Sequence, residues 1–260
     1  MKPENITYQK IESVLHEFRK TDLETLSDAH FSKRYEKKFI MHESGLEELL
    51  KRSRSKYVVL DVDHHILQPY SSYYFDTARS DMYLNHHNYN FPRYKIRYRE
   101  YHSNDLAFLE VKMKDNKTRT FKRRVRVKKT GRHISRVEEE NFIRKETPYN
   151  PRDLSVILSN DFYRVTMAEP KSGERITLDT GISFYSEEHE RKDLEKIVVI
   201  EIKTGRMNEH TLFENLIPTG SQAESSFSKY CIGRIFFDRD LKYNNFKPVL
   251  NRIEGIQSLS

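Results

Sequence analysis

The sequence predicts an α+β protein in which antiparallel β-strands, flanked by helices, carry one basic and one apolar face. Residues 93–101, 108–114 and 121–127 alternate charged with apolar side chains, and successive side chains of a strand point to opposite faces. Apolar residues recur at helical spacing in segments before and after these runs. With 16 Tyr, 15 Phe and no Trp, aromatic side chains supply much of the expected core.

The three alternating runs concentrate cations on one face. That face holds Arg93, Lys95, Arg97 and Arg99 in the first run, Lys112 and Lys114 beside Glu110 in the second, and Lys122, Arg124 and Arg126 in the third. A single strand of this kind is usually a half-buried surface strand with its charged face in water. Surface strands normally mix both charge signs with hydroxyl side chains, whereas these faces are dominated by Lys and Arg. The pattern indicates a long, phosphate-rich anion as ligand.

The remaining elements follow from periodicity along the chain. Helical spacing predicts helices within 8–26, from about Ser44 to 54, within 133–146, and at the start of 227–237. Alternation predicts strands at 31–41, 57–63, 70–76, 161–168, 175–180 and 197–203. Residues 77–90 fit either a helical turn or a continued hairpin. No internal repeat and no interdomain linker is present.

Composition narrows the class of protein. The 260 residues suffice for one large domain, and a formal net charge of +7 favours polyanionic partners. The single cysteine, Cys231, excludes a disulfide framework and a cysteine-rich zinc site, and fits a reducing compartment. No apolar run approaches the roughly 20 residues that span a bilayer, and the first residues lack the apolar segment of a signal peptide. We therefore expect a cytoplasmic protein.

Phosphate must be held by side chains, because eight glycines and no glycine-rich loop exclude a backbone phosphate cradle. Four carboxylates lie among the cations: Glu36, Glu110, Asp179 and Glu201. Such acids often only relieve repulsion between cations. Glu201 is more specific, since it follows the buried run IVVI and lies two residues before Lys203. Mg²⁺ typically takes one or two carboxylates plus substrate phosphates, so Glu201 is a candidate metal ligand.

In order along the chain, the segments RYEKKF, SSYYFDT, KIRYREY, FLEVKMK, FKRRV, ERITLDT, VIEIKTG and SKYCIG resemble the catalytic domain of vacuolar transporter chaperone (VTC) polyphosphate polymerases. This family belongs to the triphosphate tunnel, or CYTH-like, superfamily of metalloenzymes. The resemblance covers about residues 31–240. It implies an antiparallel β-barrel that forms a charged tunnel, flanked by helices.

The resemblance also implies site residues, matched motif by motif. Expected catalytic residues are Lys38, Arg97, Arg99, Lys112, Lys122, Arg164, Arg175 and Lys229, and Glu201 matches the metal-binding glutamate. Arg124 and Lys203 join Arg97, Arg99, Lys112, Lys122, Arg164 and Arg175 as expected substrate-binding residues. Hydrolytic relatives carry an ExExK pattern in the first strand, where this chain has Arg34, Glu36 and Lys38. The loss of one carboxylate favours a polymerase.

The resemblance implies a polyphosphate polymerase that uses Mn²⁺ or Mg²⁺ to transfer the γ-phosphate of ATP to a growing polyphosphate chain. One alternative is a triphosphatase in which Glu36 or Glu110 activates water. Another is a non-catalytic binder of polyphosphate or RNA, in which aromatic residues between the arginines of 93–101 stack on bases. Strand alternation opposes it, because Tyr94 and Tyr98 point to the face opposite the arginines. ATP and inorganic polyphosphate are the expected partners, without nucleic acid.

We expect three regions. Residues 1–30 form an N-terminal helical extension, 31–245 the tunnel domain and 246–260 a C-terminal tail. We expect the protein in the cytoplasm. Any association with a membrane would depend on a membrane-protein partner that the sequence does not reveal. The SPX regulatory domain and membrane segment of eukaryotic relatives are not found in this sequence.

Overall fold

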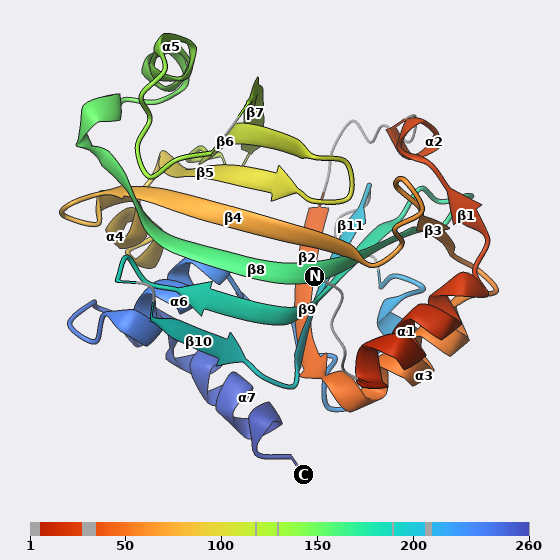
Figure 1. Ribbon diagram of the computed structural model, residues 1–260. Coiled ribbons are helices and arrows are strands. Elements are labelled where there is room, and N and C mark those ends of the chain that lie inside the picture. Colours follow the sequence, from red (N-terminus) through yellow and green to blue (C-terminus); the bar gives the residue numbers. More distant parts are fainter. Residues whose placement is uncertain are drawn as a thin grey trace.

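A curved antiparallel sheet forms the centre of the computed structural model (Figure 1), which describes residues 6–27, 35–117, 119–128, 130–188, 190–205 and 210–259. Its strands are β1 (Lys20–Thr21), β2 (Tyr35–His42), β3 (Val58–Leu60), β4 (Gln68–Thr77), β5 (Arg93–Tyr101), β6 (Leu106–Lys114), β7 (Thr120–Val127), β8 (Leu154–Ala168), β9 (Arg175–Tyr185), β10 (Arg191–Leu194) and β11 (Ile197–Thr204). The main path of this 11-stranded sheet is β2-β11-β9-β8-β4-β5-β6-β7.

Helices cover both ends of the sheet. They are α1 (Ile6–His16), α2 (Leu23–Ser27), α3 (Leu46–Ser53), α4 (Asp81–His87), α5 (Val137–Glu146), α6 (Lys229–Phe237) and α7 (Lys247–Gln257). Short 3-10 turns are η1 (Glu43–Gly45), η2 (Pro151–Asp153), η3 (Glu214–Leu216) and η4 (Asn244–Phe246). The expected α+β class is confirmed. Within residues 77–90 the helical alternative is correct, since α4 forms there.

The sheet is an open barrel rather than a closed one. In the described part of the chain, the outer strands β2 and β7 do not pair with each other. The free edge of β2 is covered instead, because Ser225 N–H donates to the Lys38 carbonyl and the Arg252 side chain donates to the Ile40 carbonyl. Curvature still brings the walls together, since Lys112 Nζ of β6 lies 3.7 Å from Glu36 Oε2 of β2.

The outer face of the sheet is apolar and covered by helices. Near β2, β9 and β11, α1 and α3 bury Leu15 and Leu50 against strand residues such as Ile200. Near β5 to β7, Ile143 of α5 joins a cluster with Ile96. The charged residues that alternate with these apolar ones therefore face the interior. Residues 1–30 thus include a helix packed on the domain.

The inner face is apolar at one end only, where α6 and α7 fill it. Val249, Ile253 and Ile256 of α7 pack in one cluster with Ile40 of β2 and Val199 of β11. Residues 246–260, expected as a tail, therefore contain a helix that contributes to the core. The remainder of the inner face carries the charged side chains and forms the candidate site.

Candidate active site

Glu110 of β6 organises one wall of the interior. It is 2% exposed and accepts two hydrogen bonds from Arg97 of β5, Nε at 2.9 Å and Nη2 at 2.7 Å. Lys122 Nζ of β7 lies 2.6 Å from the other carboxylate oxygen. The three residues lie on adjacent strands: Arg97 faces Glu110 directly, whereas Lys122 is displaced by two residues along β7 from the position opposite Glu110. Burial alone would raise the pKa of Glu110, but the charges of Arg97, Arg99 and Lys122 outweigh it and hold that pKa far below its ordinary value.

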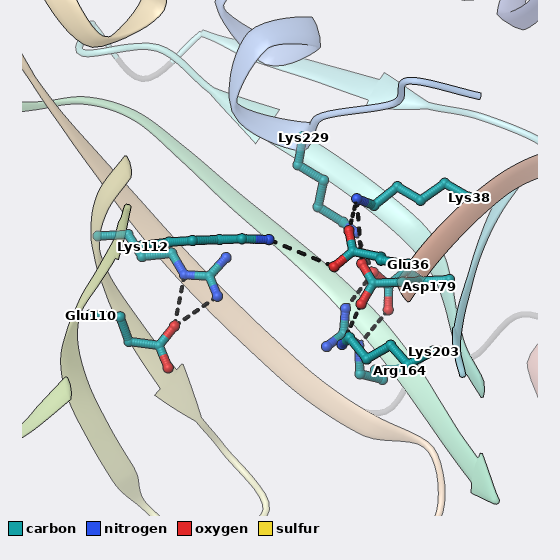
Figure 2. A network of polar contacts seen from close by, with 10 residues as sticks. Glu36, Lys38, Glu110, Lys112, Arg164, Asp179, Lys203 and Lys229 are labelled. Carbon is teal, nitrogen blue, oxygen red and sulfur yellow. Dashed lines mark hydrogen bonds and ion pairs between the residues drawn. The ribbon is translucent and has the colours of Figure 1, made fainter. Parts of the chain in front are cut away.

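Asp179 of β9 organises the opposite wall (Figure 2). It is buried and pairs with Arg164, its cross-strand neighbour on β8, and with Lys229 at the start of α6. Burial alone would raise the pKa of Asp179, but the charges of Arg164 and Lys229 outweigh it and lower that pKa to about 2. Asp179 therefore stays ionised and holds both cations toward the interior.

The start of α6 contacts both walls of the interior. Ser228, the N-cap, accepts a hydrogen bond from the Cys231 N–H and another from Lys95 Nζ of β5 at 3.0 Å, while the next residue, Lys229, reaches Asp179. Gly233 lets the helix lie directly on the sheet, because a Cβ there would meet Leu158 Cδ2 and Phe184 Cδ1 at 2.6 Å. The close packing of α6 on the sheet at Gly233 therefore sets the position of Lys229, the first residue of the helix.

Arg99 differs from the other interior arginines. It is 6% exposed, its Nε donates to Ser72 Oγ at 3.3 Å, and no carboxylate pairs with it among the described residues. Its guanidinium lies over the rings of Tyr70 and Phe162, 5.5 and 5.6 Å from their centroids. Burial and the positive charge of Arg97 lower the pKa of Arg99. Buried charges in proteins are normally paired with an opposite charge, which sets Arg99 apart from Arg97 and Arg164.

A third cluster combines two carboxylates with two lysines (Figure 2). Lys38 of β2 pairs with Glu36 and lies 3.6 Å from Glu201 of β11, which also pairs with Lys203. The charges of Lys38 and Lys203 hold the pKa of Glu201 far below normal, against the effect of burial. Glu36 and Glu201 repel each other electrostatically, and Lys38 bridges them. Two neighbouring carboxylates of this kind form a donor set suited to a divalent cation.

Two expected residues share the inner face but contact groups outside the acidic clusters. Arg175 of β9, which alternates onto the face of Asp179, donates its guanidinium to the backbone carbonyl of Leu26 in α2. Arg124 of the exposed strand β7 lies opposite Glu110, and its guanidinium is 4.5 Å from the Phe108 ring centroid. Arg34 falls outside the described residues. The other expected strand residues on this face are Lys38, Arg97, Arg99, Lys112, Lys122, Arg164, Lys203 and Glu201. Lys229 reaches the same interior from α6.

The structure adds residues that sequence reasoning missed. Ser72 and Ser228 hold interior cations, and only Ser228 had a signal, its place directly before Lys229. Asn160 of β8 is 0% exposed, lies opposite Ser72, and has no partner for its amide atoms among the described residues. Nothing in the sequence distinguishes Asn160 from an ordinary strand residue. These positions depend on cross-strand register.

The fold and the site define a protein with an open antiparallel barrel and a cation-lined interior. The chain belongs to the VTC domain family, whose model matches residues 33–238. The resemblance seen in the sequence is thereby confirmed. A search of curated proteins finds no match.

Solved structures with a similar arrangement are distant. HpAC1 from Hippeastrum, described as having a dominant triphosphatase activity, is 14% identical, with a TM-score of 0.46 over 78% of this chain and 95% of that one. A candidate adenylate cyclase from Vibrio parahaemolyticus is 12% identical, with a TM-score of 0.42 over 76% of this chain and 97% of that one. Because these likenesses are weak, the assignment rests on the family match. Among the described residues, no helix combines the length and the apolar character that crossing a bilayer demands.

Proposed function

We propose that this protein is a polyphosphate polymerase that transfers the γ-phosphoryl group of ATP to the end of a polyphosphate chain held in its interior. The observation that carries the proposal is the excess of inward cations over carboxylates, arranged on both walls around the buried anchors Glu110 and Asp179. Membership of the VTC domain family supports the same reaction class.

Phosphoryl transfer requires mainly alignment and neutralisation of oxygen charge, so a catalytic nucleophile is unnecessary. Arg97, Arg99 and Lys122 from one wall would hold the triphosphate. Arg164 and Lys229 from the other would hold the chain end that attacks. Glu110 fixes Arg97 and Lys122, and Asp179 fixes Arg164 and Lys229, before substrate arrives, so little reorganisation of these four cations accompanies binding.

Glu201, with Glu36 beside it, would hold Mn²⁺ or Mg²⁺ against the phosphate oxygens. When bound, the ion would neutralise charge on the transferred phosphoryl group. Lys38 and Lys203 form ion pairs with Glu201. With the ion bound to the carboxylates, the two lysines would be free to contact phosphate.

Hydrolysis is the main alternative, and the electrostatics disfavour its water-activating base. Lys38 and Lys112 hold the pKa of Glu36 below normal, and Arg97, Arg99 and Lys122 do so for Glu110, against the effect of burial in both cases. A carboxylate with such a low pKa accepts a proton poorly at neutral pH.

The product distinguishes the two reactions. Purified protein incubated with ATP and Mn²⁺ should give ADP and a polymer ladder on a gel. Orthophosphate as the only new phosphate product would establish the triphosphatase instead. The same incubation with single-stranded RNA added should leave polymer synthesis unaffected if nucleic acid is not a partner.

A further inference from the structure

The ladder between β5 and β6 contains an electrostatic imbalance at one end. Arg97 faces Glu110 across it, but the next two pairs toward the strand end are Lys95 with Lys112 and Arg93 with Lys114. Like charges directly opposite each other on a sheet are destabilising. At the Arg93 end of this ladder, cations therefore face cations, whereas the neighbouring pair of Arg97 and Glu110 is neutral.

Among the described residues, Lys95 is an interior lysine that lacks an acidic partner. Its ammonium group donates to Ser228 Oγ at 3.0 Å, and no ion pair joins it to a carboxylate in the described part of the chain. By contrast, Lys112 lies 3.7 Å from Glu36 and Lys122 lies 2.6 Å from Glu110. Burial, with the nearby charges of Lys112, Lys38 and Arg93, lowers the pKa of Lys95 to about 7. An anion at this place would restore its full charge.

Arg93 continues the same row to the first residue of β5, beside α4. Its guanidinium donates to the carbonyl of His86 at 3.5 Å and lies 4.9 Å from the Phe91 ring centroid. Arg93 begins β5 and Lys114 ends β6, so both lie at the strand end. Arg99 lies six residues after Arg93 along β5, a distance of roughly 20 Å. A ligand with more than three phosphates is required to contact both ends of this row together.

We propose that Lys95, Arg93 and Lys114 form a second anion subsite, which binds the polyphosphate chain where it leaves the interior beside α4. The subsite deepens the proposed function, because it rests on polyphosphate being the polymer. It gives a long polyphosphate contacts at the α4 end that a triphosphate held at Arg97 and Arg99 does not reach. Triphosphate bound at Arg97 and Arg99 would not depend on it.

The test compares two ligands by calorimetry on the full chain, tripolyphosphate and a long polyphosphate of defined length. Lys95→Gln should weaken binding of long polyphosphate about tenfold, and that of tripolyphosphate less than about twofold. Lys95→Arg, which keeps the charge, should retain most of the long-chain affinity. Lys192→Gln, an exposed lysine on β10, is the matched control. Unfolding temperatures of all variants report whether the fold is kept.

Two results with Lys95→Gln overturn the subsite: an equal loss of affinity for tripolyphosphate and long polyphosphate, or no loss of affinity for either. A third is that single-stranded RNA of equal charge binds as tightly as polyphosphate and loses as much affinity in the variant. Equal losses would place Lys95 in the triphosphate site. A long-chain loss in a protein that makes no polymer from ATP would retain the subsite and refute the polymerase.

Discussion

Arg164 and Asp179 face each other across β8 and β9 and form a two-bonded ion pair, with Arg164 Nε 2.6 Å from Asp179 Oδ1 and Nη2 2.7 Å from Oδ2. Lys229 shares the same carboxylate. One buried acid therefore holds a strand arginine and a helix lysine in fixed positions on one wall of the interior.

Asp179→Asn should destabilise the protein by about 3–5 kcal/mol, because it leaves Arg164 and Lys229 as buried charges without a counterion. Denaturant unfolding at neutral pH measures the loss. Asp193→Asn, which removes an acid paired with Arg191 on an exposed strand, should cost less than about 1 kcal/mol. Similar losses in the two variants would contradict the role assigned to Asp179.

Binding of tripolyphosphate should take up protons above neutral pH. Burial lowers the pKa of Lys122 and of Lys229 to about 8, so these lysines lose charge above that pH in the free protein. A bound polyanion favours their charged forms, and affinity should fall as pH rises from about 8 toward 10, by up to tenfold per pH unit for each linked lysine. Calorimetry in buffers of different ionisation heat measures the uptake.

Lys122→Arg should reduce this proton uptake while retaining binding, because arginine stays charged. In the free protein, the lowered pKa values of Lys122 and Lys229 make the stability of the fold rise with pH, whereas the affinity for the ligand falls. The unfolded chain binds more protons than the folded one between pH 8 and about 10.4, so the contribution of these lysines to stability rises with pH in that range. Absence of proton uptake near pH 9 would refute the linkage.

Glu201→Gln should abolish the dependence of activity on Mn²⁺ together with the activity itself, since the variant removes one of two neighbouring carboxylates. Direct Mn²⁺ titration in the presence of tripolyphosphate measures binding independently of turnover, and we expect affinity to fall at least about tenfold. Glu47→Gln, an exposed residue paired with Lys51 in α3, should behave as wild type. Unchanged Mn²⁺ affinity in Glu201→Gln would place the metal elsewhere.

Gly233→Ala should push α6 away from the sheet and displace Lys229. Its Cβ would lie 2.6 Å from Leu158 and Phe184 side-chain atoms, and overpacking of this kind costs about 1–3 kcal/mol. Gly255→Ala in α7, where a Cβ meets nothing within 4 Å, should instead stabilise by about 0.5–1 kcal/mol. Thermal unfolding and polymer synthesis should both separate the two variants.

Much of the fold follows from local pattern. The alternation at 93–101 predicted both the strand and the sharing of one face by Arg97 and Arg99, because side-chain direction in a strand has a period of two residues. Helical spacing likewise predicted a helix from about Ser44, and α3 forms there with Leu46, Leu49 and Leu50 buried. The strand β10 was missed because it has only four residues. The helix α7 was missed although its buried residues Val249, Ile253 and Ile256 recur at helical spacing.

The sequence by itself determined that this chain places rows of cations on strand faces, and its ordered motifs determined the family. Only the tertiary structure decided which cations have counterions. Arg97 is neutralised by Glu110, Arg99 contacts Ser72 and aromatic rings, and Lys95 contacts Ser228. Those partners come from other strands and from α6, up to 133 residues away in sequence. Charge pairing depends on strand register and helix docking, which side-chain alternation within one strand does not specify.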